Sequence, residues 1–222
     1  MFFNPLSLLL LFFLFIGLVF AFFLINIGLI TIAFEKIGLS PIQVFVFLLA
    51  SLLGSSINIP IKRIPRPFDD PPEAVRIFGV PYRIPRRHPH ETVIAMNLGG
   101  AVLPVLLSLS LMFKHGIFTE PLAGVAIVAA ITYFLARPVS GIGIAIPLIV
   151  PPIFAVLTAM ALAPEDLRPA IAYVSGTVGT LIGADLLHLR DVPRLNAPLV
   201  SIGGAGTFDG IFLTGIIAVL LA

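Results

Sequence analysis

The sequence predicts an all-α protein built as a polytopic bundle of about seven transmembrane helices. Of its 222 residues, 59% are hydrophobic and only 11% are charged, whereas soluble domains carry about 25% charged residues. A water-soluble fold of this size keeps much of its surface in water and cannot bury this many apolar side chains. In a bilayer the apolar side chains can face lipid instead. Seven apolar segments also approach or exceed the length that crosses a bilayer.

The span boundaries follow from a requirement of about 20 apolar residues rising 1.5 Å each. Taking residues 1–222 as one transmembrane domain, the spans are 6–34, 41–57, 92–113, 119–136, 139–163, 169–189 and 199–222, with a long loop over 58–91. The first segment lacks a leading basic residue and is too long for a signal peptide. We therefore expect it to be retained as a span.

The basic residues predict the orientation. Ten of the 13 lysines and arginines lie in loops on one side, most of them in the 58–91 loop, and Lys36, Lys114 and Arg168 lie on the other. Basic loops face the cytoplasm, so we expect a multi-pass cell-membrane protein with its amino terminus inside and its carboxyl terminus outside. The expected partner of this loop is the anionic bilayer surface, not a nucleic acid.

The 58–91 loop contains eight prolines, which exclude a helix there. Two pieces of it, 57–64 and 75–84, mix β-branched and basic residues. This composition is typical of strands, and we expect the two pieces to pair as a short ribbon at the membrane surface.

Two spans are interrupted by glycine and proline. Pro147 and Pro151 lie in span 5, which we expect to be kinked or split into half-helices shielded by protein or lining a cavity. In span 7 a glycine-rich stretch over 203–206 precedes Thr207, a suitable N-cap for a helix to Ala222. That helix is shorter than the hydrocarbon core of about 30 Å, so we expect either that the glycine-rich stretch enters the membrane or that the bilayer thins.

Two acidic residues carry the functional prediction. Nine of the eleven fall in or beside loops, and only Asp185 and Asp209 fall within apolar segments. An ionised carboxylate at mid-bilayer costs at least about 3 kcal/mol, so it needs a partner or water. The short connection between spans 6 and 7 makes them antiparallel neighbours, and we expect the two carboxyl groups to lie at similar depth and share one proton. Such a pair suits aspartic proteolysis.

Neighbouring residues in span 6 support access to this pair. Ser175, Gly179 and Gly183 recur every four residues, which predicts close packing against another helix, with Asp185 facing away from that stripe. His188, three residues beyond, shares the face of Asp185. Its two interpretations are a hydrogen bond that tunes Asp185 and an interfacial histidine in contact with water.

The segments Gly183–Leu187 and Gly204–Gly210 resemble the two-aspartate arrangement of GxGD-type intramembrane aspartic proteases, a group that includes presenilins, signal peptide peptidases and prepilin peptidases. The resemblance covers about the last 45 residues. It implies a catalytic pair, Asp185 and Asp209, with Gly204 and Gly206 admitting water and a transmembrane peptide substrate. In those families aspartate follows the second glycine directly, whereas Thr207 and Phe208 intervene here. Over its full length the chain is similar to an uncharacterised family of bacterial and archaeal membrane proteins.

Two other functions use the same residues. In a small proton-coupled transporter or channel, Asp185 and Asp209 would carry protons, and broken helices would line a cavity near Asn97, Gly99, Pro147 and Pro151. Such a cavity would be lined by both span 5 and span 7. A non-catalytic membrane scaffold is the third alternative. Because the chain contains no cysteine, disulfides and thiolate metal sites are excluded, and we expect no metal site and no cofactor.

Overall fold

The computed structural model describes residues 14–17, 27–65, 74–77, 80–83, 91–139, 143–195, 197–204 and 210–222. After a helical segment over Ile27–Lys36, the α-helices are α2 (Pro41–Gly54), α3 (Leu103–His115), α4 (Thr119–Leu135), α5 (Val150–Leu162), α6 (Arg168–Thr180) and α7 (Gly210–Leu221). Two π-helical segments, η1 (Leu98–Val102) and η2 (Leu181–Leu186), precede α3 and follow α6, and η3 (Leu189–Leu195) is a 3₁₀ helix. The strands are β1 (Asn58–Pro65), β2 (Ala74–Ile77), β3 (Val80–Arg83), β4 (Glu91–Asn97), β5 (Arg137–Val139), β6 (Gly143–Ala145) and β7 (Leu199–Ile202).

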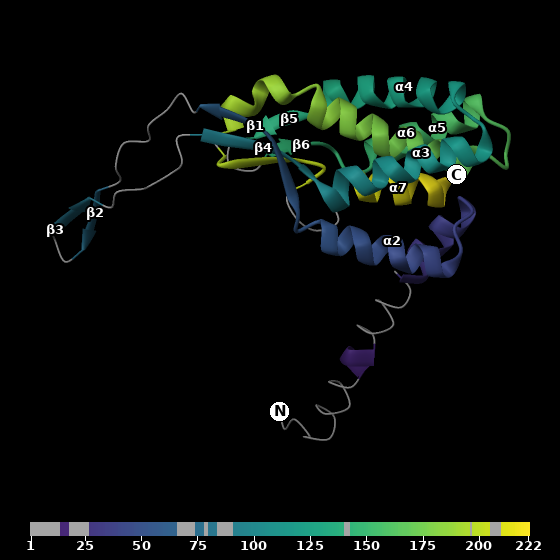
Figure 1. Ribbon diagram of the computed structural model, residues 1–222, viewed down its shortest axis with the longest axis horizontal. Helices are drawn as coiled ribbons and strands as arrows, with labels where there is room; N and C mark the ends of the chain where they lie inside the picture. The colour runs from purple at the N-terminus through teal and green to yellow at the C-terminus, as the bar shows by residue number, and fades with distance from the viewer. Residues whose placement is uncertain are drawn as a thin grey trace, which may run out of the picture.

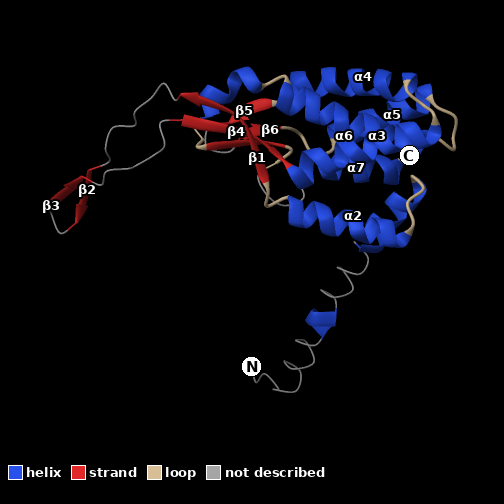
Figure 2. Cartoon of the chain, viewed as in Figure 1, coloured by secondary structure: helices blue, strands red, loops and turns tan. Residues whose placement is uncertain are grey.

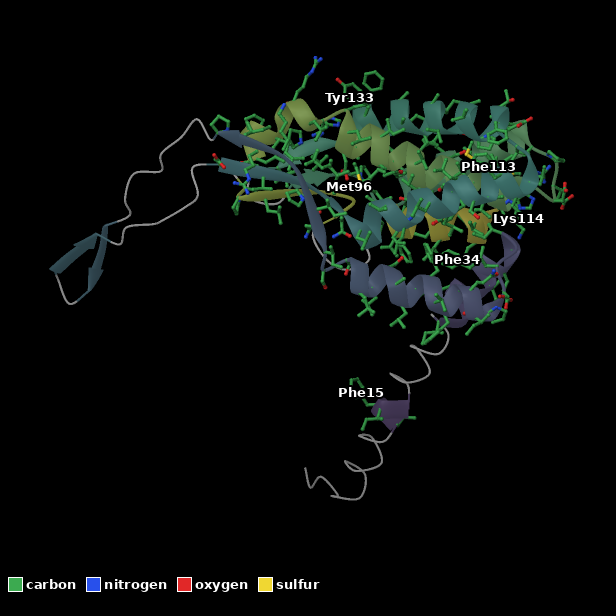
Figure 3. All side chains as sticks on the ribbon, in the orientation of Figure 1. Phe15, Phe34, Met96, Phe113, Lys114 and Tyr133 are labelled. Atoms are coloured by element: carbon green, nitrogen blue, oxygen red, sulfur yellow. The ribbon has the colours of Figure 1, made fainter. Side chains whose placement is uncertain are left out.

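The described residues are mostly helical, as predicted. Successive helices run in alternating directions along the bundle, and the strands β1, β4, β5 and β6 gather at one of its ends (Figure 1, Figure 2). We call this the sheet end and the opposite end the turn end. Figure 3 places Met96 at the sheet end and Phe113 and Lys114 at the turn end.

Helix α6 forms the centre of the bundle, because all but one of its residues from Ala170 to Thr180 are buried. It approaches α4 closely: a Cβ added to Gly179 would lie 2.7 Å from Val128 Cβ, and one added to Gly183 would overlap the Thr132 hydroxyl. The predicted close packing of the small-residue stripe is therefore confirmed, with α4 as its partner. On another side, Gly176 lets α6 approach Ala155 of α5 and Ala218 of α7.

The amino-terminal part joins this bundle through an aromatic cluster. Ile27–Lys36 and α2 are bent by 114° relative to each other at the intervening break. The ring of Phe34 lies 5.2 Å from that of Phe47 on α2, 6.1 Å from that of Tyr173 on α6 and 6.3 Å from that of Phe212 on α7. Rings at these separations are in favourable contact, so the cluster holds four helical segments together.

The loop strands pair differently from the predicted ribbon. Strand β1 pairs antiparallel with β4, which in turn pairs parallel with β7, giving the sheet order β1-β4-β7. Strands β2 and β3 pair with each other, and so do β5 and β6. The prediction that 57–64 pairs with 75–84 is therefore wrong, because β1 pairs with β4, and β2 and β3, which are close in sequence, pair with each other. Strand β1 lies at the edge of its sheet, where its prolines, which lack a backbone N–H, are tolerated.

Three predicted spans are not helical throughout. Span 3 begins with β4 and η1, span 5 begins with β5 and β6, and span 7 begins with β7. Proline accounts for where the helix starts in span 5: Pro151 of α5 lies in the first helical turn, where the missing N–H costs nothing. By length and composition only Leu98–His115 is long and apolar enough to cross a membrane among the described helices. The bent pair of Ile27–Lys36 and α2 makes a second only if it counts as one span.

Candidate functional site

A cavity at the sheet end is lined in part by Asp185. Its volume is about 300 Å³. Its walls come from β6, η2, η3, β7 and the turn after β7, with the lining residues Gly143, Ile144, Asp185, Leu189, Val192, Ala197, Leu199, Val200, Ser201, Ile202 and Gly204. Most of these side chains are apolar, so the polar atoms of Asp185, Ser201 and Gly204 determine what the cavity can bind.

The position of Asp185 is set by a π-helical segment and a glycine turn. Segment η2 continues α6 with wider turns, as the hydrogen bond from Leu187 N to Ile182 O of 2.9 Å shows. Short π-helical segments within α-helices are rare and often occur at functional sites. Half-buried Asp185 accepts a hydrogen bond of 2.7 Å at Oδ2 from the backbone N–H of Gly203. Meanwhile Gly183, two residues earlier, faces α4. This agrees with the prediction that Asp185 points away from the small-residue stripe.

The Gly203 peptide lies between the two π-helical segments. Its N–H reaches Asp185 of η2, and its carbonyl oxygen packs so closely against Gly100 of η1 that a side chain on Gly100 would overlap it. Gly203 and Gly204 have φ angles of 82° and 87°, a left-handed conformation that favours glycine. Two glycine-rich stretches that are far apart in sequence thus meet beside the cavity.

Behind this turn, an asparagine network ties β1, β4 and β7 together. Asn97 is only 1% exposed, and its Oδ1 accepts from Gly100 N at 2.8 Å. Its Nδ2 therefore donates to Ser55 O at 2.7 Å and to Asn58 Oδ1 at 3.2 Å. The hydroxyl of Ser201 lies 2.5 Å from the same Asn58 Oδ1 and 2.7 Å from Gly204 O. The network fixes the orientation of both amides.

His188 is buried against α4, which bears on one of the two interpretations made from sequence. It is 6% exposed, and its ring lies 4.9 Å from that of Tyr133 on α4. Its Nδ1 lies 3.0 Å from the Gly183 carbonyl oxygen, which only accepts, so Nδ1 carries a hydrogen. Burial contradicts a histidine in contact with water. The ring secures η2 against α4.

The structure brings some of the predicted site residues to the cavity and leaves others elsewhere. Asp185 and Gly204 line it. Asn97 and Gly99 stand behind the glycine turn, Pro151 is buried in the first turn of α5, and Pro147 is exposed; none of these four is in the cavity wall. Gly206, Thr207 and Asp209 lie outside the described residues, and with them the predicted pairing of Asp185 with Asp209.

Sequence reasoning missed Ser201, Asn58 and Ile144. Ser201 carries a usable signal, because it is a hydroxyl within an apolar strand and directly precedes a glycine pair. Asn58 and Ile144 carry none, since their roles depend on strands that meet only in the folded chain. Among the described residues, no group of three or more histidine, aspartate and glutamate side chains is placed to hold a metal ion.

The family comparison applies to most of the chain. Residues 52–221 match the family described as "Protein of unknown function (DUF1614)". The chain belongs to this family. No curated protein and no solved structure matches it. The family's matched region contains both π-helical segments, the three-stranded sheet and every residue that lines the Asp185 cavity.

Proposed function

We propose that this chain is an integral membrane protein that moves protons, alone or coupled to a small solute, with Asp185 as the proton-carrying group. One observation supports this most directly: the Asp185 cavity is lined by Gly143 and Ile144 of predicted span 5 and by residues 199–204 of predicted span 7. A cavity shared by these two interrupted spans is the arrangement expected for a transporter. Non-helical backbone at membrane depth is tolerated where it lines such a cavity.

The outer surface of the bundle supports placement in lipid. Large apolar side chains point outward from α2, α3, α4 and α5, and Phe134 and Phe113 are 81% and 72% exposed. Soluble monomers seldom expose apolar surface on this scale. The alternating helix directions (Figure 1) support a multi-pass arrangement. Basic residues of β1, β5 and η3 (Lys62, Arg63, Arg137 and Arg190) also belong to the sheet end, which supports a cytoplasmic location for that end.

The proposed mechanism needs few moving parts. Asp185 takes a proton from water in the cavity onto a carboxylate oxygen and later returns it to water on the other side. Protonation removes the negative charge that strengthens the Gly203 N–H bond. That bond weakens, and the glycine turn between η1 and η2 is freed to move. If protonation of Asp185 is coupled to movement of this turn, the cavity opens alternately to the two sides of the membrane.

A liposome assay tests this proposal. The full chain is reconstituted with a pH-sensitive dye inside, and a potassium diffusion potential drives proton entry. We expect faster acidification than in protein-free liposomes, and we expect Asp185→Asn to reduce it to the protein-free rate. Asp166→Asn, which removes an exposed carboxylate from the loop before α6, serves as the matched control and should keep the wild-type rate. Equal rates for wild type and Asp185→Asn would contradict the proposal.

A second candidate, a membrane-embedded aspartic peptidase, is favoured by the position of β7. This strand ends the sheet order β1-β4-β7. Its consecutive residues 199–202 all line the cavity, which indicates that the strand presents its edge rather than one face. An extended peptide that added to this edge would lie beside Asp185. Asp209 would supply the second carboxyl group.

Cleavage assays separate the two candidates. Incubating the reconstituted protein with a model transmembrane peptide should release fragments if it is a peptidase, and Asp185→Asn and Asp209→Asn should each abolish them. If the peptide stays intact while proton flux is measurable, only the transport candidate remains. If neither cleavage nor flux is detected, the remaining candidate is a non-catalytic membrane scaffold.

A further inference from the structure

An apolar groove lies between α2 and α3, apart from the Asp185 cavity. Its volume is about 410 Å³, and the described residues of its wall expose only apolar atoms. Gln43 fits this wall because its amide is held at the start of α2, where Oε1 accepts from Ser40 N at 2.8 Å and from Ser40 Oγ at 3.1 Å. The lining residues are Ile42, Gln43, Val46, Phe47, Ala50 and Leu103.

Helix α2 is attached to the rest of the bundle on both sides of this groove. At the sheet end it touches η1 so closely that a Cβ on Gly99 would overlap the Ser51 carbonyl oxygen. At the turn end, Lys114 Nζ of α3 donates to Gly38 O, just before α2, at 2.7 Å. A helix held at both ends cannot simply close onto α3, so the groove is a fixed part of the fold.

The dimensions of the groove suit one acyl chain. From Ile42 to Ala50 the wall rises about 12 Å along α2, and the hydrocarbon depth of one leaflet is about 15 Å, half of the bilayer core. Helix α2 lies along the bundle (Figure 1), so the groove runs parallel to the bundle helices, as acyl chains do. A membrane-crossing helix from a second copy would extend well beyond it.

The turn end of the groove carries positive charge. The groove begins at Ile42, four residues after Gly38, which contacts Lys114. Lys36, two residues before Gly38, is also exposed, and Glu35 is the one acidic residue between positions 27 and 54. Two lysines against one glutamate leave a net positive charge where the headgroup of a lipid in the groove would lie. Lysines at the membrane surface attract anionic lipid headgroups.

We propose that the groove between α2 and α3 holds one acyl chain of an anionic glycerophospholipid, with the lipid phosphate at Lys36 and Lys114. The lipid fills the space between the two helices and is part of the packing of the bundle, not a transported solute. The inference rests on the membrane placement in the proposed function and does not involve Asp185.

Native mass spectrometry of the delipidated full chain in detergent tests the site, with dioleoyl phosphatidylglycerol and its neutral phosphatidylcholine counterpart as probes. We expect one phosphatidylglycerol per chain, bound in preference to phosphatidylcholine. Ala50→Phe fills the groove and should abolish this binding. Ala126→Phe adds the same ring to an exposed position of α4 outside the groove and should bind as wild type does. Lys114→Met should lower the preference for phosphatidylglycerol roughly fivefold, as expected for one lysine near anionic lipid.

Three results would overturn the inference: no preference for phosphatidylglycerol in the wild type, unchanged binding in folded Ala50→Phe, and occupation of the groove by a second copy. Because the chain has no cysteine, Val46→Cys places a single thiol in the groove, and a high yield of disulfide-linked dimer on oxidation of membranes would show that occupation. If Ala50→Phe is not monodisperse, Val46→Phe replaces it, since Val46 is 56% exposed. Bound lipid without proton flux would keep the lipid site and remove the transport proposal, and flux without bound lipid would do the reverse.

Discussion

Where helices end, some backbone N–H and C=O groups have no partner within the helix. The two ends of the bundle supply hydrogen-bond partners for these groups in different ways. At the turn end, lysines do so near solvent: Lys36 Nζ donates to Leu220 O at 3.2 Å at the end of α7, and Lys114 Nζ donates to Gly38 O at 2.7 Å. Gly116 ends α3 in a left-handed conformation with a φ of 64°. These are the usual means by which helices end in short turns.

At the sheet end the same requirement is met by buried polar groups. Asn97 bonds to the backbone of two other segments, Ser201 contacts Asn58 and Gly204, and Asp185 accepts from Gly203. Strands and π-helical segments replace simple turns, and a cavity of about 300 Å³ is left among them. The contrast indicates that the turn end is a structural closure, whereas the sheet end has the polar, irregular construction of a binding site.

Gly203→Ala should have the largest effect on this contrast. A Cβ at this residue would lie 2.6 Å from Ala101 Cβ and 2.7 Å from Ala101 N, and the φ of 82° would be strained as well. We expect a loss of about 4 kcal/mol of stability from overpacking and strain combined, measured by thermal unfolding in detergent. Gly143→Ala also has a positive φ but meets open space, so it should lose only the smaller contribution from strain. Equal losses would show that the Gly203 contacts are unimportant.

Asn97→Ala should cause the second-largest loss of stability. It removes an acceptor from Gly100 N and a donor from Ser55 O and Asn58 Oδ1 at a buried site. Leaving these groups without their partner should cost about 3 kcal/mol. Ser55→Ala is the control, because the Asn97 bond goes to the Ser55 backbone carbonyl and survives that change. Chemical unfolding of both variants tests this order, and a larger loss in Ser55→Ala would contradict it.

Asp185→Ala should cost about 2 kcal/mol, because Gly203 N–H loses its acceptor in a half-buried position. In Asp185→Asn the amide oxygen can still accept from Gly203. We expect this variant to keep most of the stability while losing proton flux. Thermal unfolding and the liposome assay on the same preparations measure the two effects. An Asn variant as unstable as the Ala variant would assign Asp185 a larger electrostatic role in folding.

The smallest effect is expected at the turn end. Lys114→Met removes the exposed contact to Gly38 O and should cost about 0.5 kcal/mol, as is typical for a charge near exposed helix termini. Lys62→Met, on the exposed edge strand β1, should change stability less still. Both should leave proton flux unchanged. A reduced flux in Lys114→Met would remove the functional distinction between the two ends.

The sequence predicts some of these features well and others poorly. The spacing of Ser175, Gly179 and Gly183 predicted a close helix contact, and its partner is α4. The isolation of Asp185 in an apolar segment selected a residue that lies in the cavity wall. The strand β4 was expected to be helix, because its run of β-branched and apolar residues has no polar alternation that distinguishes a buried strand from a span. The contacts of His188 with Tyr133 and Gly183 had no signal in the sequence, because only packing brings these residues to its ring.

By itself, the sequence determined the apolar segments, the helix starts at proline, the left-handed glycine turn and the unusual setting of Asp185. These depend on hydrophobicity and on steric effects within a few residues, which local sequence encodes. Only the tertiary structure decided that β4 pairs with β7, that Gly100 meets Gly203, and that Asn58 meets Ser201 across 143 residues. Such contacts have no local signal, because their energy arises from groups that become neighbours only when the chain is packed.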